Sequence, residues 1–528
     1  MNKSLNLLIL ILLVSNVPSF AIDECPIVPL PSKVIRNEGH LDIATLRQIN
    51  ISDRRLASVA YLLQNQILER TGLSVPLFLE TRSGSAILLS MVADSDEEEG
   101  YSLSISPTKV EVKAATVHGV FNGVMSLLQL LSVAAVKGEG VPCWQIDDVP
   151  QMKWRGLMLD ESRHFFGGEM VKKILDWMAF YKLNKFHWHL TDVPGWRIEI
   201  KTFPNLTLVG GIGNHTDQHA TAEYYTQDEI REIVRYASER FIEVIPEIDM
   251  PGHAKAANRA YPEYSGGGSE KYPDFTFNPG KEETYGYLAK ILREVDVLFP
   301  SKMIHLGGDE VHFGNEKWNT DRHVQSFMKK RNLTDLKAVE HYFIERMADT
   351  IVNLGSKVLG WDEIAGTRIP PDNAIIFWWR HNLPETLKQS IQNGYKVVLC
   401  PRIPMYFDFV QNEHHRVGRK WQNTYSDLKT VYSYSMDQYP DIINNKNRDQ
   451  VAGIQANLWS EVIVTDARLE YMLFPRITAL AEAAWTDPKN RDYGKFCQRL
   501  STHETLFRKA SLYFYDVDSP ESTPEVVR

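Results

Sequence analysis

From residue 155 onward, short apolar runs alternate with longer amphipathic stretches. Apolar runs of four to eight residues are typical of buried strands, and apolar positions three or four residues apart are typical of helices. The strand-like runs are 155–160, 185–190, 241–249, 303–310, 357–363, 374–379, 396–401 and 451–459. Helical stretches follow most of them, as at 169–181, 284–298, 336–354 and 468–485. This alternation predicts an α/β fold, a (β/α)8 TIM barrel.

Residues 22–150 have a different pattern, with shorter elements. Strand-like runs occur at 87–91, 101–105 and 110–113, and helical patterns at 56–71 and 117–134. Pro142 and the Asp-Asp-Val-Pro segment at 147–150 mark the end of this region. We therefore expect a small α+β domain over 22–150, followed by the barrel domain over 151–528.

The first residues have the features of a secretory signal. A lysine precedes a short apolar run at 5–14, and Ser19-Phe-Ala21 supplies the small residues that signal peptidase requires. This predicts a signal peptide over 1–21, and no later run is expected to be long enough to span a membrane. The secretory route leads to the extracellular space or lysosome, or to the periplasm in a bacterial host. The predicted glycosylation acceptors are Asn50, Asn205, Asn214 and Asn332.

Composition excludes several classes of protein. An apolar content of 43% and a charged content of 24% are typical of a soluble globular chain. The net charge of −9, without a basic cluster, argues against a nucleic-acid partner. Four widely spaced cysteines exclude a zinc ribbon; Cys25 and Cys143 are the candidate disulfide, and Cys400 is expected to be buried and free. The sequence leaves open whether the chain forms a homodimer.

Asp309 and Glu310 follow two glycines at the end of the run that begins at Met303. Adjacent side chains on a regular strand point to opposite faces. Both carboxylates can therefore serve one site only if the backbone curls, which the glycines permit. Two close carboxylates do not both ionise easily, so one keeps a proton toward neutral pH and can act as an acid. The residues alone do not say which one.

Charged and aromatic side chains also stand at or just after the other strand ends. They are Arg163, Asp192, Asp249, His253, Trp361, Trp378, Tyr406, Asp408, Trp459 and Glu461. In a TIM barrel, the C-terminal strand ends form one rim that carries the catalytic groups. Indole faces stack on sugar rings and carboxylates bind hydroxyls, so the set predicts a carbohydrate site.

Six motifs, in order between residues 150 and 490, resemble those of the glycoside hydrolase family 20 β-N-acetylhexosaminidases. They are Arg155-Gly-Leu-Met-Leu-Asp-Glu-Ser-Arg-His164, His187-Trp-His-Leu-Thr-Asp192, Pro246-Glu-Ile-Asp-Met-Pro-Gly-His253, His305-Leu-Gly-Gly-Asp-Glu310, Gly360-Trp-Asp-Glu363 and Asn457-Leu-Trp-Ser-Glu461. The N-terminal region is similar to the small α+β domain that precedes the barrel in this family.

The resemblance implies a retaining, substrate-assisted mechanism, in which the acetamido oxygen of the sugar attacks the anomeric carbon. Glu310 would act as general acid and then as base, kept protonated by Asp309. Asp309 would orient the acetamido N–H and stabilise the oxazolinium intermediate. The other implied roles are a relay behind Glu310 (Asp192, His253), an acetamido-oxygen donor (Tyr406), a wall around the methyl group (Trp361, Trp378, Trp459) and ligands for the far hydroxyls (Arg163, Asp408, Glu461).

The residues leave two alternatives, a metal-dependent amidohydrolase and an inactive sugar-binding barrel. His187 and His189 share a strand face, and metal-dependent amidohydrolases also carry such a pair at a barrel strand end. Here the pair lies on the second strand, and no later histidine–aspartate set completes a site. An inactive sugar-binding barrel would usually have lost the acid, but Asp309, Glu310 and Tyr406 are all present. We therefore expect an exo-acting enzyme without a cofactor, with chitin oligomers or glycans ending in β-linked N-acetylglucosamine or N-acetylgalactosamine as substrates.

Overall fold

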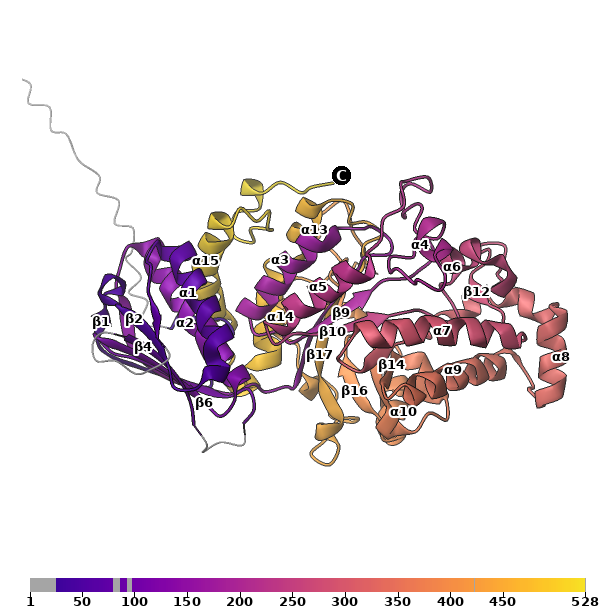
Figure 1. Cartoon of the computed structure of the whole chain (residues 1–528), viewed down its shortest axis with the longest axis horizontal. Coiled ribbons are helices and arrows are strands. Elements are labelled where there is room, and N and C mark those ends of the chain that lie inside the picture. The colour runs from indigo at the N-terminus through magenta and orange to yellow at the C-terminus, as the bar shows by residue number, and fades with distance from the viewer. Residues whose placement is uncertain (1–24, 79–85, 93–96, 422, 528) are drawn as a thin grey trace, which may run out of the picture.

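The computed structural model describes residues 25–78, 86–92, 97–421 and 423–527. The predicted signal peptide over 1–21 lies outside the described residues. Figure 1 shows a layered N-terminal part beside a larger barrel. The two predicted architectures, a small α+β unit and a (β/α)8 barrel, are both confirmed.

The N-terminal part is a seven-stranded mixed sheet in the order β1-β7-β5-β6-β4-β2-β3. Its strands are β1 (Lys33–Leu41), β2 (Gln48–Ile51), β3 (Leu77–Phe78), β4 (Ala86–Met91), β5 (Tyr101–Ile105), β6 (Lys109–Ala114) and β7 (Val141–Asp148). Two helices, α1 (Ala57–Thr71) and α2 (Val117–Lys137), cover the sheet on the side that faces the barrel (Figure 1). The predicted strands and helices of this region are all present.

Helix α2 is apolar around most of its circumference because it is covered on two sides. It packs on β5 and β6 and also on α3 and α15 of the barrel part. Contrary to expectation, it is long and apolar enough to cross a membrane, the one such helix within the described residues. However, 89% of its apolar segment is buried inside the protein. Packing between the two parts therefore accounts for its hydrophobicity.

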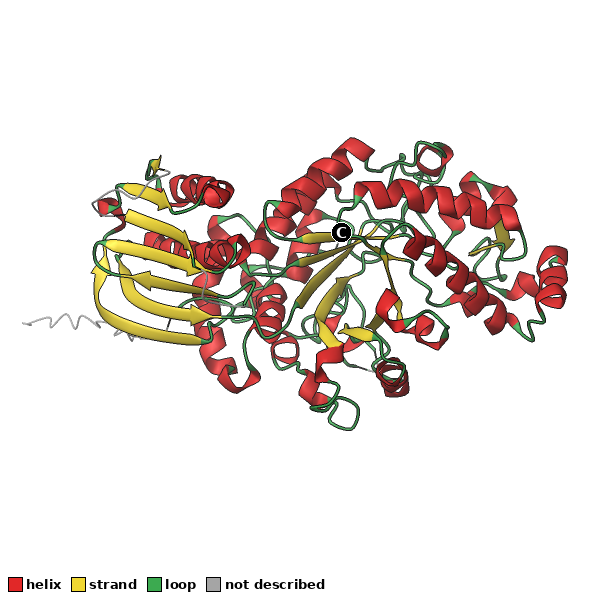
Figure 2. Cartoon of the chain, turned by 60° about the horizontal axis from the view of Figure 1, so that its bottom comes forward, coloured by secondary structure: helices red, strands yellow, loops and turns green. Residues whose placement is uncertain are grey.

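The barrel consists of eight parallel strands that close on themselves (Figure 2). Each one matches a predicted run: β8 (Trp154–Asp160), β9 (Lys185–His189), β10 (Glu243–Glu247), β13 (Met303–His305), β14 (Lys357–Trp361), β15 (Ala374–Trp378), β16 (Lys396–Leu399) and β17 (Val451–Leu458). A hairpin of β11 (Ser265–Gly267) and β12 (Thr276–Phe277) projects from the loop after β10.

The helices around the barrel are mostly those predicted. The longer ones are α3 (Gly167–Phe180), α5 (Gln227–Ser238), α7 (Glu282–Leu298), α8 (Arg322–Arg331), α9 (Leu336–Asn353), α10 (Pro384–Gln392), α13 (Asp466–Leu473), α14 (Arg476–Trp485) and α15 (Tyr493–Lys509). The short ones are α4 (Asn205–Leu208), α6 (Lys255–Ala260), α11 (Arg402–Met405) and α12 (Leu428–Tyr432). The single helix predicted over 468–485 is wrong: α13 ends before Pro475, which has no N–H to continue a helix.

The predicted disulfide is also wrong, because all four cysteines are free. Cys25 is buried at the junction of the two parts, with Lys182 and Asp148 among its charged neighbours. The sulfur of Cys143 instead faces Gly39 of β1. The two thiols therefore have different surroundings. Cys400 is buried and free, as predicted.

The glycosylation acceptors differ in accessibility. Asn50 lies on β2 and is 1% exposed, so it is not available in the folded chain and its prediction is wrong. Asn205 and Asn332 are exposed and Asn214 is half-buried. Modification at these three positions stays a prediction.

Asp148, at the end of β7, ties the two parts together. One carboxylate oxygen accepts hydrogen bonds from the Ser32 backbone N–H at 3.0 Å and the Trp485 indole at 2.9 Å. The other accepts from the Tyr101 hydroxyl at 2.7 Å and the Lys182 ammonium at 3.3 Å. The side chains of Asp148 and Lys182 are fully buried, so each charge depends on the other.

Asp148→Ala should lower the free energy of unfolding by about 3–5 kcal/mol, since it leaves the Lys182 charge buried and unpaired. Chemical denaturation measures this loss. As a control, Asp228→Ala removes an exposed ion pair with Arg231 and should cost less than about 1 kcal/mol. Equal losses for the two variants would contradict a structural role for Asp148.

Candidate active site

The backbone turns sharply after β13, as the two glycines suggested. Gly307 and Gly308 have φ values of 72° and 92°, and Glu310 is left-handed with φ 52°. A Cβ on Gly307 would lie 1.8 Å from a carboxylate oxygen of Asp249, so no larger residue fits there. The turn brings Asp309 and Glu310 to the same imidazole. The Nε2 atom of His253 lies 3.6 Å from the Asp309 carboxylate and 3.7 Å from that of Glu310.

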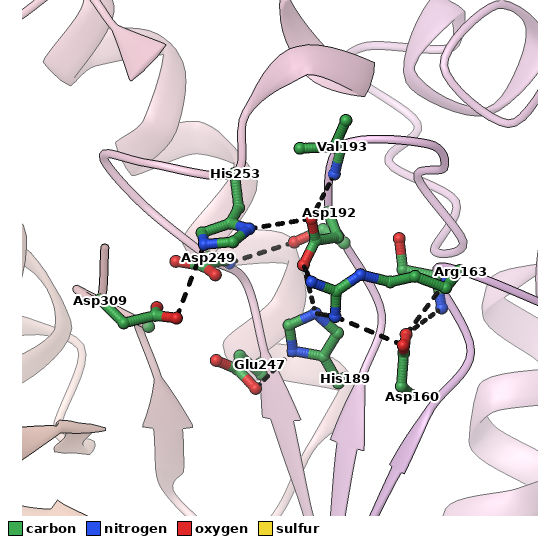
Figure 3. Close-up of polar contacts among 12 residues, drawn as sticks. Asp160, Arg163, His189, Asp192, Val193, Glu247, Asp249, His253 and Asp309 are labelled. Atoms are coloured by element: carbon green, nitrogen blue, oxygen red, sulfur yellow. Dashed lines mark hydrogen bonds and ion pairs between the residues drawn. The ribbon is translucent and has the colours of Figure 1, made fainter. Parts of the chain in front are cut away.

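His253 connects this pair to Asp192. Its Nδ1 atom lies 2.9 Å from Oδ1 of Asp192, and Figure 3 shows the imidazole between Asp192 and Asp309. Burial lowers the pKa of His253, but the negative charges of Asp192 and Asp309 outweigh that effect and raise it well above its usual value. The predicted relay residues are thus brought together, with a charged imidazole facing the two carboxylates.

Asp192 is held by four donors. Its Oδ2 atom accepts from Arg163 at 2.7 Å and lies 3.0 Å from Nε2 of His189. Its Oδ1 atom accepts from His253 and, at 2.5 Å, from the backbone N–H of Val193. His189 also places Nδ1 2.6 Å from the carboxylate of Glu247 (Figure 3). Because both of its ring nitrogens face carboxylates, His189 is an imidazolium.

His187 and His189, which lie two positions apart on β9, both face the barrel interior, as their spacing predicted. His187 Nε2 lies 3.0 Å from Glu247, which also contacts His189 and His305. Among the residues that the structure describes, three groups of buried side chains lie close enough together to hold a metal ion: His187 with Glu247 and His305, His189 with Asp192 and Asp249, and Asp249 with His253 and Asp309. In each group a carboxylate already contacts a histidine or arginine, which a cation would have to displace.

The catalytic candidates differ in pKa. Burial raises the pKa of Asp309 to about 7, against the opposing charge of His253 and with the charge of Glu310 adding to the rise. Burial also acts on Glu310, but the positive charge of the neighbouring His253 outweighs it, so its pKa is lowered. The two opposite shifts favour the proton on Asp309 rather than on Glu310. These directions differ from the expectation that Glu310 is held protonated, because Asp309 is less exposed than Glu310, 13% against 31%.

Aromatic rings line the space next to this pair. Trp361 donates its indole N–H to Glu247 at 2.9 Å, and its ring centroid lies 5.8 Å from that of Trp459. The Tyr406 ring is 6.0 Å from Trp459 and stacks on Trp379 at 6.3 Å. These four buried side chains belong to one apolar cluster inside the barrel.

Trp378 does not belong to this cluster, so its predicted place in the wall is wrong. Its indole donates to Thr386 at 3.2 Å and packs edge-on against Tyr439, in the core outside the barrel. Trp378 is the last residue of β15, and neighbours on a strand face opposite sides. Trp379 therefore faces inward and occupies the position expected for Trp378.

Charged side chains lie next to the aromatic cluster and form a polar wall beside Trp459. The guanidinium of Arg163 lies over the Trp459 ring at 4.9 Å, and Asp408 is fully buried. Arg419 contacts the two carboxylates predicted to bind hydroxyls. Its Nε atom lies 3.0 Å from Asp408, and its Nη2 atom lies 2.6 Å from Glu461. Burial raises the pKa of Asp408 to about 7, opposed by Arg419.

The sequence interpretation missed three residues of this site. Glu247 is the last residue of β10, two positions before Asp249, and the predicted run 241–249 would have placed both on one face, a signal that was available. Trp379 is visible only once the inward face of β15 is known. Arg419 lies in an irregular segment after Asp408 and matches no spacing pattern.

The raised pKa of Asp309 predicts a pH-dependent stability. The group ionises near pH 3.8 ordinarily and near pH 7 in the fold. Between these values the folded state binds a proton that the unfolded state lacks, so this contribution to stability falls as pH rises. Asp309→Asn removes the effect. The variant should melt at a higher temperature than the wild type at pH 8, and the difference should vanish near pH 4, as followed by circular dichroism. A wild type that is the more stable at pH 8 would contradict the shift.

Comparison with known proteins agrees with this geometry. The family models "Glycosyl hydrolase family 20, catalytic domain" and "domain 2" match residues 152–488 and 24–149. A β-hexosaminidase of Porphyromonas gingivalis is 34% identical over 90% of this chain, which spans 62% of that relative. A GH20 exo β-N-acetylglucosaminidase of Vibrio harveyi superposes with a TM-score of 0.85 at 29% identity, covering 93% of this chain and 78% of the other. A β-N-acetylhexosaminidase of Bacteroides fragilis gives 0.82 at 30%, covering 95% and 99%. The chain is thus a glycoside hydrolase and belongs to glycosyl hydrolase family 20.

Proposed function

We propose that the protein is an exo-acting β-N-acetylhexosaminidase that removes terminal β-linked N-acetylglucosamine or N-acetylgalactosamine with retention of configuration. The observation that carries the proposal is the turn after β13, which directs Asp309 and Glu310 to one imidazole beside a cluster of buried aromatic side chains. A carboxylate pair next to buried indoles suits a sugar ring. The activity of the named relatives supports the same assignment.

In the proposed reaction the acetamido oxygen of the substrate attacks the anomeric carbon. Glu310 donates a proton to the leaving oxygen and later removes one from water. Asp309 accepts a hydrogen bond from the acetamido N–H and stabilises the positive oxazolinium ring. Tyr406 donates a hydrogen bond to the acetamido oxygen. Trp361, Trp379 and Trp459 enclose the methyl group.

The closed polar wall supports exo cleavage. Arg163, Asp408 and Glu461 would bind the hydroxyls of the terminal sugar. Arg419 bridges Asp408 and Glu461 behind them. A chain extended beyond the terminal sugar would have to break these ion pairs, so only the end unit fits.

Substrate binding also accounts for the location of the proton. An acetamido N–H that donates to Asp309 favours the ionised form of that carboxylate. The proton of the pair then belongs on Glu310, which needs it for acid catalysis. The two carboxylates act as a unit that carries one proton.

Asp309→Asn tests this mechanism. Turnover of an aryl β-N-acetylglucosaminide should fall by roughly 10²–10³-fold, because the oxazolinium loses its counter-charge. Inhibition by a thiazoline analogue of the intermediate should weaken in parallel, because both depend on one carboxylate. Steady-state kinetics measure both.

Aryl β-glucosides, which lack the acetamido group, serve as the control and should hardly react. Efficient hydrolysis of the glucoside, or a sugar ester on Asp309 detected by mass spectrometry, would rule out substrate assistance. The thermal melt of Asp309→Asn shows whether the variant is folded.

The neighbouring tryptophans allow a matched comparison. Trp379→Phe should lower kcat/KM by roughly 3–10-fold, since it removes part of the wall, whereas Trp378→Phe should lower the melting temperature and leave kcat/KM within about twofold. Kinetics and thermal unfolding of the two variants decide the point. The opposite result would place Trp378 in the pocket.

A further inference from the structure

Arg402 is held rigidly beside the pocket. It begins α11, directly after β16, and its backbone N–H donates to the carbonyl of Trp379 at 2.9 Å. Its guanidinium lies 4.6 Å from the ring centroid of Trp379 and 4.3 Å from that of Trp421. Cation–π contacts with two indoles orient the planar group and leave its N–H edge for other partners.

The other arginines around the pocket have carboxylate partners. Arg163 pairs with Asp192 at 2.7 Å, Arg419 with Glu461 at 2.6 Å and Arg380 with Asp362 at 2.9 Å. For Arg402, no ion pair or side-chain hydrogen bond occurs within the described part of the chain, and none of its nitrogens is a buried unpaired atom. Its donors therefore reach solvent. An ordered guanidinium without a protein partner is suited to bind an external anion.

The position of Arg402 links it to the reaction. Trp379 stacks on Tyr406 and hydrogen-bonds to Glu363 at 3.1 Å. Arg402 and Tyr406 thus contact the same indole, that of Trp379, and the negative charge of Glu310 favours the arginine cation. A group bound by Arg402 would therefore belong to the same glycan that Glu310 cleaves.

We propose that Arg402 forms a binding site for an oxyanion carried by the glycan, a sulfate or a carboxylate, beside Trp379 and Trp421. The planar fork of arginine matches both groups with two parallel hydrogen bonds. The proposal rests on the proposed function and adds a substrate class to it: acidic glycans. The anion has two candidate sources, the terminal sugar or the sugar that leaves.

The test compares substrates that differ only in charge. One pair is the aryl β-N-acetylglucosaminide and its 6-O-sulfate; the other is N-acetylglucosamine β-linked to glucose or to glucuronate. In Arg402→Met the ratio of kcat/KM between the acidic and neutral members should fall roughly tenfold in one pair, which identifies the source. Arg402→Lys keeps the charge but not the fork and should give an intermediate ratio. High salt should lower the wild-type ratio and leave that of Arg402→Met unchanged.

Equal losses on acidic and neutral substrates would overturn the proposal and leave Arg402 as a support for Trp379 and Trp421. Wild-type kcat/KM values on all four substrates in Arg402→Met would overturn it too. Titration with inorganic sulfate, followed by tryptophan fluorescence, gives a readout without turnover: saturable quenching in the wild type should be lost in Arg402→Met. A wild type that binds sulfate but does not cleave the neutral substrate would overturn the proposed function and keep the anion site.

Discussion

The site depends on the buried carboxylate of Asp192. Two donors, Arg163 and His189, bind one of its oxygens, and His253 with a backbone N–H binds the other. Because every favourable direction around the carboxylate is taken, His253 has one orientation available. That orientation directs Nε2 toward Asp309 and Glu310. Residues after three separate strands meet at this one group, so the relay exists only when the barrel has closed in register.

Charges alternate through the interior from Glu247 through His189 and Asp192 to His253. A single charge buried in this way would cost several kcal/mol, whereas each charge here has opposite neighbours on both sides. The alternation lets the barrel keep an imidazolium next to the reacting carboxylates. It also ties Trp361 to the relay, because the same Glu247 accepts the indole N–H. Glu247 thus connects the relay behind the acid–base pair to one residue of the aromatic wall.

The sequence predicted the barrel well because strands buried on both faces appear as continuous apolar runs. It also identified the carboxylate pair, since two glycines before adjacent acids have few other purposes. Its errors have physical causes. Alternation along β15 allows only one of Trp378 and Trp379 to face inward, but which one depends on the twist of the closed barrel. Arg419 reaches the pocket through an irregular segment, and the location of the proton depends on small differences in exposure between Asp309 and Glu310.

Several features of the site work against the stability of the fold. Glu310 and His253 have left-handed backbones, which cost roughly 1–2 kcal/mol each in residues other than glycine. Burial that raises the pKa of Asp309 and of Asp408 adds to this cost at neutral pH. These residues follow strands whose hydrogen bonds are shared around a closed barrel, where one strand end cannot relax without disturbing its neighbours. The strain is therefore retained, and it is what places two adjacent carboxylates on the same side of the chain.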